Sequence, residues 1–503
     1  MSWDQSSRPA PLDTHPVRVI AGHLRDELRA LGRYPPGPSG FSIGRTLRTT
    51  RDPLPLLLEL YEKHGPVFSF RALHHRLVWM IGPDANQFIT VSHPEHFNWR
   101  EGHLGDLTPL IGDGILTTDG EYHDRARRLM MPAFHQRQLE SAIEVMVSET
   151  ERALEGWAPG QVVDVYQWTR GLALRIAMRA LLGLDPDDGD HGAAAAHHFE
   201  RGLAFYGIDA HLRLLRGPGT PWARLQGARR DLDEIVYAEI ARRRRHGAPG
   251  RTDVMSALIE AEDEDGSRFS DEEVRDQLVT LMFAGHDTSS SNVAFLLYEL
   301  ARHPDVLDRI RDEERRVLAG DPPSAAQLHG QLPELEMAID EALRLYPPVW
   351  IGARRAVSGF EFAGCEVPEG AYVNYSSWAS HRLPHVFPEP EAFKPERFSR
   401  ERKAALPKGA YIPFGGGSRI CIGKRFGQTV VRTVVTLLLQ RFHPRLLPGY
   451  ELRLALEPTL SPRGGLPMVA REEPDRPRRN PPRSGAIRQN RRARGASLGR
   501  DRR

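Results

Sequence analysis

The spacing of apolar and polar residues divides the chain into a largely helical body with short extended segments near each end. The segment PLPLLLELYEKHG is helix-like, and Gly65 marks its end. PVFSFRAL and RLVWMIG follow, rich in β-branched and aromatic residues, and their close succession predicts a hairpin. From residue 120 to 345 the pattern is mainly helical, with breaks at stretches rich in Gly, Pro and Asp.

One helix is signalled with particular clarity. Ser270 and Glu273 form a capping-box pattern, and apolar periodicity continues from there to about Leu300. A helix of about thirty residues spans roughly 45 Å, so we expect it to cross a whole domain. Beyond Arg344 the chain becomes Pro-rich and irregular, with short strands near 359–373 and a last helix after Cys421.

The composition is that of an ordinary globular chain. Of its 503 residues 40% are hydrophobic and 27% charged, with a formal net charge of +2, and we expect no nucleic-acid partner. No signal peptide and no run of ~20 apolar residues occurs. The two cysteines, Cys365 and Cys421, follow no disulfide or zinc spacing, which indicates a reducing compartment. We therefore expect a cytoplasmic protein without a transmembrane anchor, in which Cys365 is a small buried hydrophobe.

We predict one domain between two less ordered ends: a partly ordered leader over 1–34, a mainly helical domain with a minor β part over 35–470, and a disordered tail over 471–503. The tail holds twelve arginines and four acidic residues. Because it has almost no large apolar side chains, it cannot bury enough apolar surface to offset the conformational entropy that ordering would cost. It is either a solvated segment without a binding role or a basic segment that attracts an acidic partner.

The most informative segment is FGGGSRICIG, from Phe414 to Gly423, where glycines surround Cys421. It resembles the haem-binding signature of the cytochrome P450 family, whose cysteine ligates the iron and favours O–O cleavage. The resemblance implies that Phe414 shields the sulfur and that Arg419 pairs with a haem propionate. Gly417 and Gly423 would let the backbone approach the flat macrocycle, and backbone N–H groups would tune the sulfur.

A second motif lies within the long helix, where Ala284-Gly-His-Asp287-Thr288 interrupts a stretch that should face the core. Buried polar groups are costly and usually serve a purpose. In the family this segment passes over the oxygen-binding face of the haem, where Ala284 would contact it. Thr288 would organise a water and Asp287 would connect it to bulk solvent for proton delivery. Alternatively, Thr288 bonds back to the Ala284 carbonyl and Asp287 lies on the surface.

Two further constellations match family positions. His123 and Arg127 are four residues apart and share a helix face suited to anionic oxygens, as on the family's propionate-binding helix. Arg354 is another propionate candidate, although Arg355 beside it leaves the choice open. The last constellation consists of Glu341 and Arg344, which can form an ion pair, and Arg397 in PERF; it resembles the Glu-Arg-Arg network behind the haem, and we assign it to folding.

The resemblance covers about residues 35–470 and implies the cytochrome P450 fold, a long central helix crossing over haem b, and a monooxygenase. Such an enzyme inserts one atom of O2 into a lipophilic molecule by hydroxylation or epoxidation. Electrons would come from NAD(P)H through a reductase and a separate ferredoxin or flavodoxin. Lys424 and Arg425 lie where the family docks that partner, although ordinary surface charge explains them equally well.

Other functions of a haem-thiolate protein remain alternatives: a peroxygenase, isomerase or dehydratase, or a non-enzymatic haem sensor. The first three commonly lack the pair formed by Asp287 and Thr288, and a sensor has no need of proton delivery. By family position, the substrate pocket would be walled by Phe205, Phe283, Ala284, Val349, Trp350, Ile351 and Leu460. These apolar and aromatic residues favour a terpenoid, fatty acid or steroid-like substrate without ranking the three.

Overall fold

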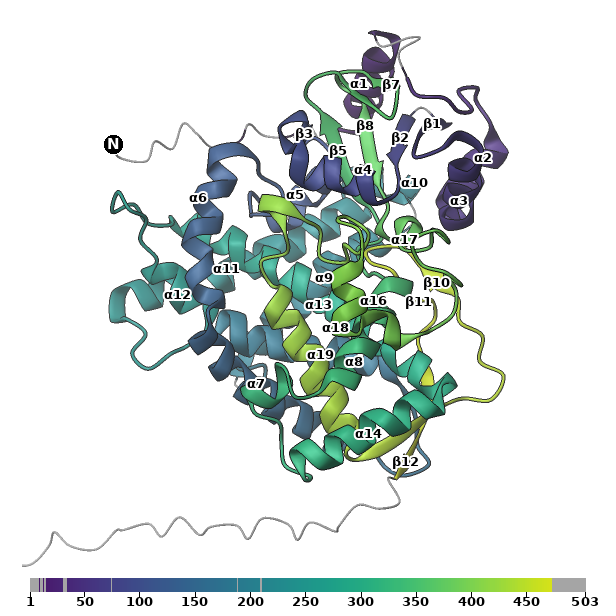
Figure 1. Ribbon diagram of the computed structural model, residues 1–503. Helices are drawn as coiled ribbons and strands as arrows, with labels where there is room; N and C mark the ends of the chain where they lie inside the picture. The colour runs from purple at the N-terminus through teal and green to yellow at the C-terminus, as the bar shows by residue number, and fades with distance from the viewer. Residues whose placement is uncertain are drawn as a thin grey trace, which may run out of the picture.

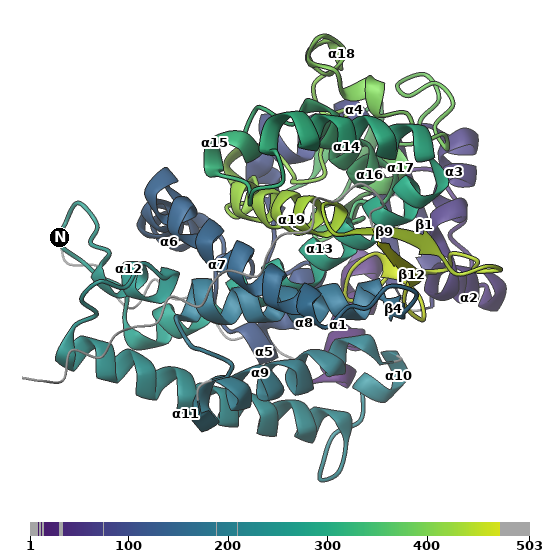
Figure 2. The ribbon, with the colours of Figure 1, turned by 90° about the horizontal axis from the view of Figure 1, so that it is seen from below.

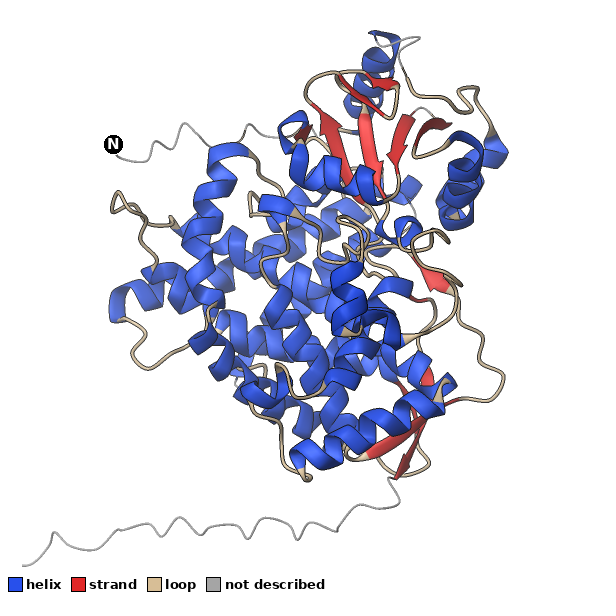
Figure 3. Ribbon diagram, in the orientation of Figure 1, coloured by secondary structure: helices blue, strands red, loops and turns tan. Residues whose placement is uncertain are grey.

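The computed structural model describes residues 9, 12, 15–29, 34–73, 75–187, 189–208 and 210–472. Helices fill most of the molecule, and a mixed sheet lies at one edge of it (Figure 1 and Figure 3). The predicted mainly helical fold with a minor β part is therefore confirmed. The structure describes about half of the predicted leader, and only residues 471 and 472 of the predicted tail. Within the described ranges, no helix has the length and apolar character needed to span a membrane.

The helices are α1 (Pro16–Arg29), α2 (Ile43–Arg51), α3 (Pro53–His64), α4 (Pro83–Gln87), α5 (Thr108–Ile111), α6 (Gly120–Met130), α7 (Gln136–Glu155), α8 (Val165–Ala177), α9 (Gly189–Leu203), α10 (Ala210–Arg213), α11 (Pro221–His246), α12 (Val254–Glu260), α13 (Asp271–Arg302), α14 (Pro304–Leu318), α15 (Ala325–Leu328), α16 (Pro333–Leu345), α17 (Ser377–Ser380), α18 (Arg400–Ala405) and α19 (Lys424–Leu439). The strands are β1 (Val67–Ala72), β2 (His75–Met80), β3 (Phe97–Asn98), β4 (Val162–Asp164), β5 (Gly352–Ala356), β6 (Phe360–Phe362), β7 (Cys365–Val367), β8 (Tyr372–Tyr375), β9 (Phe442–Leu446), β10 (Leu454–Ala455), β11 (Ser461–Pro462) and β12 (Pro467–Glu472).

The larger sheet has the strand order β1-β2-β8-β5-β3. The predicted hairpin forms β1 and β2, which pair antiparallel with Phe68 opposite Trp79. Strand β8 joins β2 in parallel, so a distant part of the chain completes the sheet. Phe68, Phe70 and Trp79 are buried in one apolar cluster beneath it, because alternate residues of a strand share a face.

The predicted long helix is α13, which begins at a capping box. The Ser270 hydroxyl accepts the Glu273 N–H, and the Glu273 carboxylate accepts the Ser270 N–H. Asp271, Glu272 and Glu273 lie in its first turn, where the helix dipole favours negative charge. The 32 residues span about 48 Å. The helix runs through the interior between α19 and α8 (Figure 2) and also contacts α11 and α16.

A fully buried ion pair on α16 connects this helix to the chain that precedes the cysteine loop. The Arg344 Nε lies 2.8 Å from Glu341 Oε2, and neither side chain reaches solvent. Arg397 Nε lies 3.3 Å from Glu341 Oε1. The Arg344 guanidinium also donates to the backbone carbonyls of His381, Pro390 and Ala392. These contacts place Glu341, Arg344 and Arg397 together, in the arrangement that the sequence predicts.

We predict that Arg344→Met lowers the free energy of unfolding by about 3–5 kcal/mol, because it leaves the Glu341 carboxylate buried without its main partner. Chemical denaturation monitored by circular dichroism measures this loss. Arg397→Met is the matched control, and it should cost less because its single contact to Glu341 is longer and partly exposed. Equal losses in the two variants would contradict this account.

Candidate active site

Cys421 lies in the loop just before α19. Its N–H donates to the Phe414 carbonyl at 2.9 Å, and Phe414 is half-buried against the main apolar cluster. Burial raises the pKa of the Cys421 thiol, while a hydrogen bond from the Gly423 backbone lowers it. Although protein atoms surround the thiol, the residue retains an accessible surface and counts as exposed. A cysteine that is surrounded by protein and still accessible lies on the wall of an internal space.

The two predicted loop glycines are required for different reasons. Gly417 has φ +62°, and a Cβ there would lie 1.9 Å from the Thr90 carbonyl oxygen. The close approach seen at Gly417 is to the protein's own backbone, and the approach of this loop to a cofactor stays a prediction. A Cβ at Gly423 would meet no atom within 4 Å. Of the two, only Gly423 faces open space.

The middle of α13 borders an open space of the same kind. Most of this helix is buried, yet Ala284 is exposed and Phe283, Gly285 and Thr288 are half-buried. A Cβ at Gly285 would meet no neighbouring element within 4 Å. Ala284 and Thr288 are one helical turn apart and share a face. Helix α13 therefore has an accessible face in the interior of the molecule.

Close packing of α19 on α13 brings the cysteine loop near this accessible face. A Cβ at Gly427 would lie 3.6 Å from Ser289 Oγ, so the two helices meet at these residues. Cys421 and Ala284 each lie a short distance along the chain from this contact. The thiol and the accessible face of α13 therefore border the same region.

The predicted alcohol and acid lie at this face in unlike environments. The Thr288 Oγ1 donates to the Ala284 carbonyl at 2.6 Å, so the back-bonded alternative describes its hydroxyl here. Asp287 is buried rather than on the surface, which excludes the second part of that alternative. Its Oδ1 lies 2.9 Å from Arg170 Nε on α8, so the two side chains form an ion pair.

Arg170 and Asp287 belong to a partly buried charge cluster that also contains Glu200 on α9 and His286 on α13. Arg170 lies 3.1 Å from Glu200 Oε2, and His286 Nε2 lies 3.1 Å from Glu200 Oε1. Burial alone would lower the pKa of Arg170, but the carboxylates of Asp287 and Glu200 outweigh it and raise that pKa. Burial likewise opposes ionisation of Glu200, yet contacts with His286 and Arg170 lower its pKa.

Arg170 and Glu200 escaped the sequence prediction. A signal was present, because Arg170 interrupts the apolar segment VYQWTRGLALRIA and a buried acid needs a cationic partner. Nothing in the local pattern says which of the many arginines provides it.

Cationic side chains gather on another side of the site. Arg354 Cζ lies 3.5 Å from the centre of the Trp99 ring, and Arg419 Cζ lies 4.9 Å from the same centre. Arg355 instead lies over Tyr372, since neighbouring residues of a strand point to opposite faces. The structure therefore places Arg354, and not Arg355, beside Arg419.

Arg127 of α6 belongs to this cationic group, and His123 of the same helix lies beside it as a neutral imidazole. Burial, then the charge of Arg419, lowers the pKa of His123 to about 4. Burial also lowers the pKa of Arg127 and brings that of Arg419 to about 10, while Asp119 opposes the latter shift. Buried cations that depress one another's pKa fit an anionic ligand, because an added negative charge would relieve both the repulsion and the burial cost.

An accessible thiol, an open face of a long helix and a group of buried guanidiniums fit a flat, iron-containing ligand with two carboxylates. These features define the class of haem-thiolate proteins. The comparisons with known proteins agree: a model of the cytochrome P450 family, "Cytochrome P450", matches residues 35–466. The chain belongs to the cytochrome P450 family, in which haem is the cofactor and the typical reaction is monooxygenation.

Several relatives support this assignment. The chain is 34% identical to cyclooctat-9-en-7-ol 5-monooxygenase of Streptomyces melanosporofaciens, over 82% of this chain and 89% of that protein. It is 31% identical to cyclooctatin synthase of the same organism, over 84% and 92%. Among solved structures, the retinoic acid bound cyanobacterial CYP120A1 superposes with a TM-score of 0.78 and 28% identity, over 88% of this chain and 99% of that one.

Five of the seven predicted pocket residues belong to or pack against two apolar clusters. Phe205 and Phe283 pack in a cluster that includes residues of α9, α11 and α13. Trp350 and Ile351 lie against the cluster beneath the larger sheet, and Leu460 lies fully buried within it. Leu460 offers no surface to a substrate here, whereas Val349 is about half exposed.

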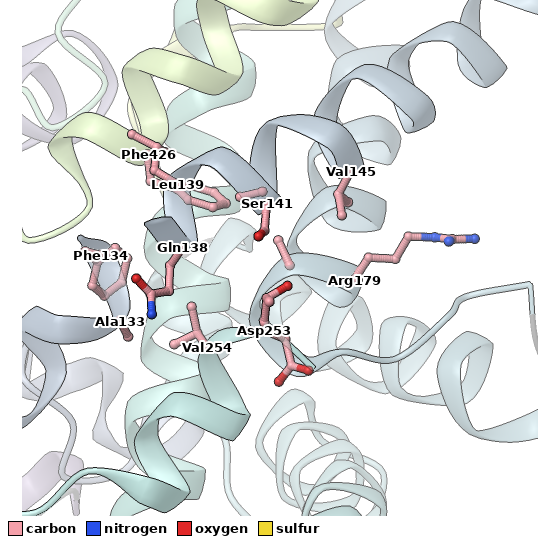
Figure 4. Close-up of a pocket in the computed structure, with 13 residues that line it drawn as sticks. Ala133, Phe134, Gln138, Leu139, Ser141, Val145, Arg179, Asp253, Val254 and Phe426 are labelled. Atoms are coloured by element: carbon pink, nitrogen blue, oxygen red, sulfur yellow. The ribbon is translucent and has the colours of Figure 1, made fainter. Parts of the chain in front are cut away.

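A separate pocket, shown in Figure 4, contains none of the predicted site residues. Its walls include Phe134, Leu139, Val254 and Phe426, and its volume is about 40 Å³. That volume holds little more than one or two waters, so it does not accommodate a lipophilic substrate.

The buried state of His123 predicts a pH dependence of stability. Its folded pKa is about 4, while the unfolded value is about 6.5. As the pH falls between these values the unfolded chain binds a proton that the folded chain does not, so the stability contributed by neutral His123 decreases. The loss of unfolding free energy from about pH 7 to about pH 5 should therefore be smaller in His123→Phe than in the wild type.

Denaturation curves at the two pH values measure this difference. The control is a Phe substitution at His385, which is exposed and should leave the loss unchanged. An identical pH dependence in His123→Phe and the wild type would show that His123 does not titrate in this range.

Proposed function

We propose that this monooxygenase inserts one atom of O2 into a lipophilic terpenoid, by hydroxylation or epoxidation, with Cys421 as the haem ligand. The observation that carries the proposal is a buried acid, Asp287, directly beside Thr288 where α13 is accessible in the interior. The apolar residues expected at the pocket suit an uncharged substrate. Two relatives are named for cyclooctatin chemistry, which favours a terpenoid over a fatty acid or a steroid.

Bound haem supplies an iron that activates O2, and the protein's own residues supply binding and protons. Arg354, Arg419, Arg127 and His123 would hold the propionates, with Arg354 and Arg419 already oriented by the Trp99 ring. Thr288 would exchange its bond to the Ala284 carbonyl for one to a water in the site. Asp287 would connect that water to bulk solvent, from which the protons come.

Electrons would reach the site from NAD(P)H through a reductase and a separate ferredoxin or flavodoxin. Lys424 and Arg425 are exposed at the start of α19, directly after the cysteine loop. That position would let an acidic partner approach the cysteine loop. A cytoplasmic location remains a prediction from the two unpaired cysteines.

The role of Thr288 is tested by Thr288→Ala. With a ferredoxin system and a terpenoid substrate, the variant should still oxidise NAD(P)H but form at least about tenfold less product per NAD(P)H, since proton delivery contributes factors of this order. Hydrogen peroxide should account for the difference. Ser289→Ala is the matched control, because Ser289 is the neighbouring buried hydroxyl residue.

Each outcome discriminates between functions. Unchanged coupling in Thr288→Ala would remove the hydroxyl from the proton path. Product formation from peroxide alone, or conversion without NAD(P)H, would favour the peroxygenase or isomerase alternative. The absence of any substrate-dependent turnover across a terpenoid, fatty acid and steroid panel would favour the sensor.

The haem ligand is tested by Cys421→Ala. This variant should lose the reduced-carbonyl absorption band of a thiolate-ligated haem, because no other sulfur is available in the cysteine loop. Cys365→Ala is the control: Cys365 is half-buried and packs beside a different apolar cluster, so its band should be retained. A band that persists in Cys421→Ala would refute the assignment.

A further inference from the structure

Two histidines and a glutamate converge where the chain enters strand β3 of the larger sheet. His93, Glu95 and His96 belong to the sequence HPEH, in which Pro94–His96 form a short 3₁₀-helix directly before β3. One potential ligand atom from each of the three side chains lies within 4.8 Å of the other two. Among the residues that the structure describes, no other group of three His, Cys, Asp or Glu side chains converges in this way.

The charge of Glu95 faces imidazoles rather than guanidiniums. Glu95 Oε1 lies 3.1 Å from His93 Nδ1, and the two side chains are 64% and 46% exposed. A hydrogen bond with its own backbone, then contact with His93, lowers the pKa of Glu95, so the carboxylate is ionised at neutral pH. An ionised carboxylate beside two imidazoles supplies both the negative charge and the donor atoms that a divalent metal ion needs.

Packing and hydrogen bonds hold the two histidine rings in place. The centre of the Phe88 ring lies 4.5 Å from that of His93, and 6.3 Å from that of His96, to which it stacks. His96 Nδ1 lies 2.7 Å from Ser358 Oγ, and the His96 carbonyl accepts the Val357 N–H at 2.9 Å. A partner for one ring nitrogen is the usual means by which a protein orients a metal-ligating histidine. These rings therefore lose little freedom on binding a ligand.

The ligand set determines which metal fits. Zn²⁺ binds imidazole nitrogen together with carboxylate oxygen, and three protein ligands leave a fourth tetrahedral position for water. Ca²⁺ and Mg²⁺ take oxygen ligands instead. We infer that His93, Glu95 and His96 bind a Zn²⁺ ion at the surface of the molecule, beside β3.

A metal ion at this point would support the cationic side of the active site. His96 directly precedes β3, which pairs with β5, and Trp99 directly follows β3. Arg354 and Arg419 lie over the Trp99 ring. The ion would fix the beginning of this segment and so stabilise the folded state. Zinc binding here is independent of the proposed reaction.

Isothermal titration calorimetry of the full-length, haem-loaded protein without a histidine tag tests the inference. ZnCl₂ should bind with one ion per chain, and MgCl₂ should not bind at this site. His93→Ala and Glu95→Gln should each weaken zinc binding at least about tenfold, since even the loss of a group that only supports a metal ligand costs roughly 10–100-fold. Glu95→Gln keeps the size of an exposed side chain, so it decides the question if His93→Ala does not fold.

Thermal denaturation gives a second measurement. Zn²⁺ should raise the melting temperature of the wild type, because a ligand of the folded state alone stabilises that state, and EDTA should reverse the increase. Neither variant should show this increase at the same concentration of zinc.

The matched control is His385→Ala. His385 is exposed and lies outside the group of three ligands, so its substitution should leave zinc binding unchanged. Circular dichroism and the haem absorption band show whether each variant is folded. The absence of zinc binding, equal affinity for zinc in the wild type and Glu95→Gln, or an equal loss in His385→Ala would overturn the inference. Magnesium binding as tight as zinc binding would overturn it too, because it would indicate an oxygen-ligand site.

Discussion

The central constraint on this structure is that α13 crosses the interior with polar side chains in the middle of its buried length. A carboxylate at that depth is costly unless it is paired. Asp287 is paired with Arg170 of α8, which in turn contacts Glu200 of α9. The acid therefore requires two other helices to present charge at defined positions. The same stretch of α13 leaves Ala284 accessible, so the polar residues and the open face occur together.

Positively charged side chains form the rest of the site. The guanidiniums of Arg354 and Arg419 share the Trp99 ring, and the charge of Arg419 helps to lower the pKa of His123. Such a group is stabilised by an anion more than by a neutral ligand. The thiol of Cys421, whose pKa burial raises, would ionise on binding a metal cation. The thiol therefore suits a ligand with a cation at its centre, and the guanidiniums suit anionic groups at the edge of that ligand.

The sequence predicted those features whose signals are local. The capping box of α13, the β1 and β2 hairpin and the Glu341–Arg344 spacing each lie within a few residues, and the structure contains all three. The sequence did not predict features that depend on tertiary contacts. Gly417 is glycine because of Thr90, far away in the chain, and Arg354 was distinguished from Arg355 only by the direction that each takes from β5.

Helix α1 shows a further limit of pattern reading. A period of 3.6 residues indicates that a helix has an apolar side, but it does not indicate that this side faces the core. In α13 the apolar residues turn inward because helices surround it on several sides. In α1 the buried pair of Glu27 and Arg71 turns the helix the other way, so that Val17 and Leu28 are exposed. The orientation of an amphipathic helix is therefore decided by its polar anchors where the core is already filled.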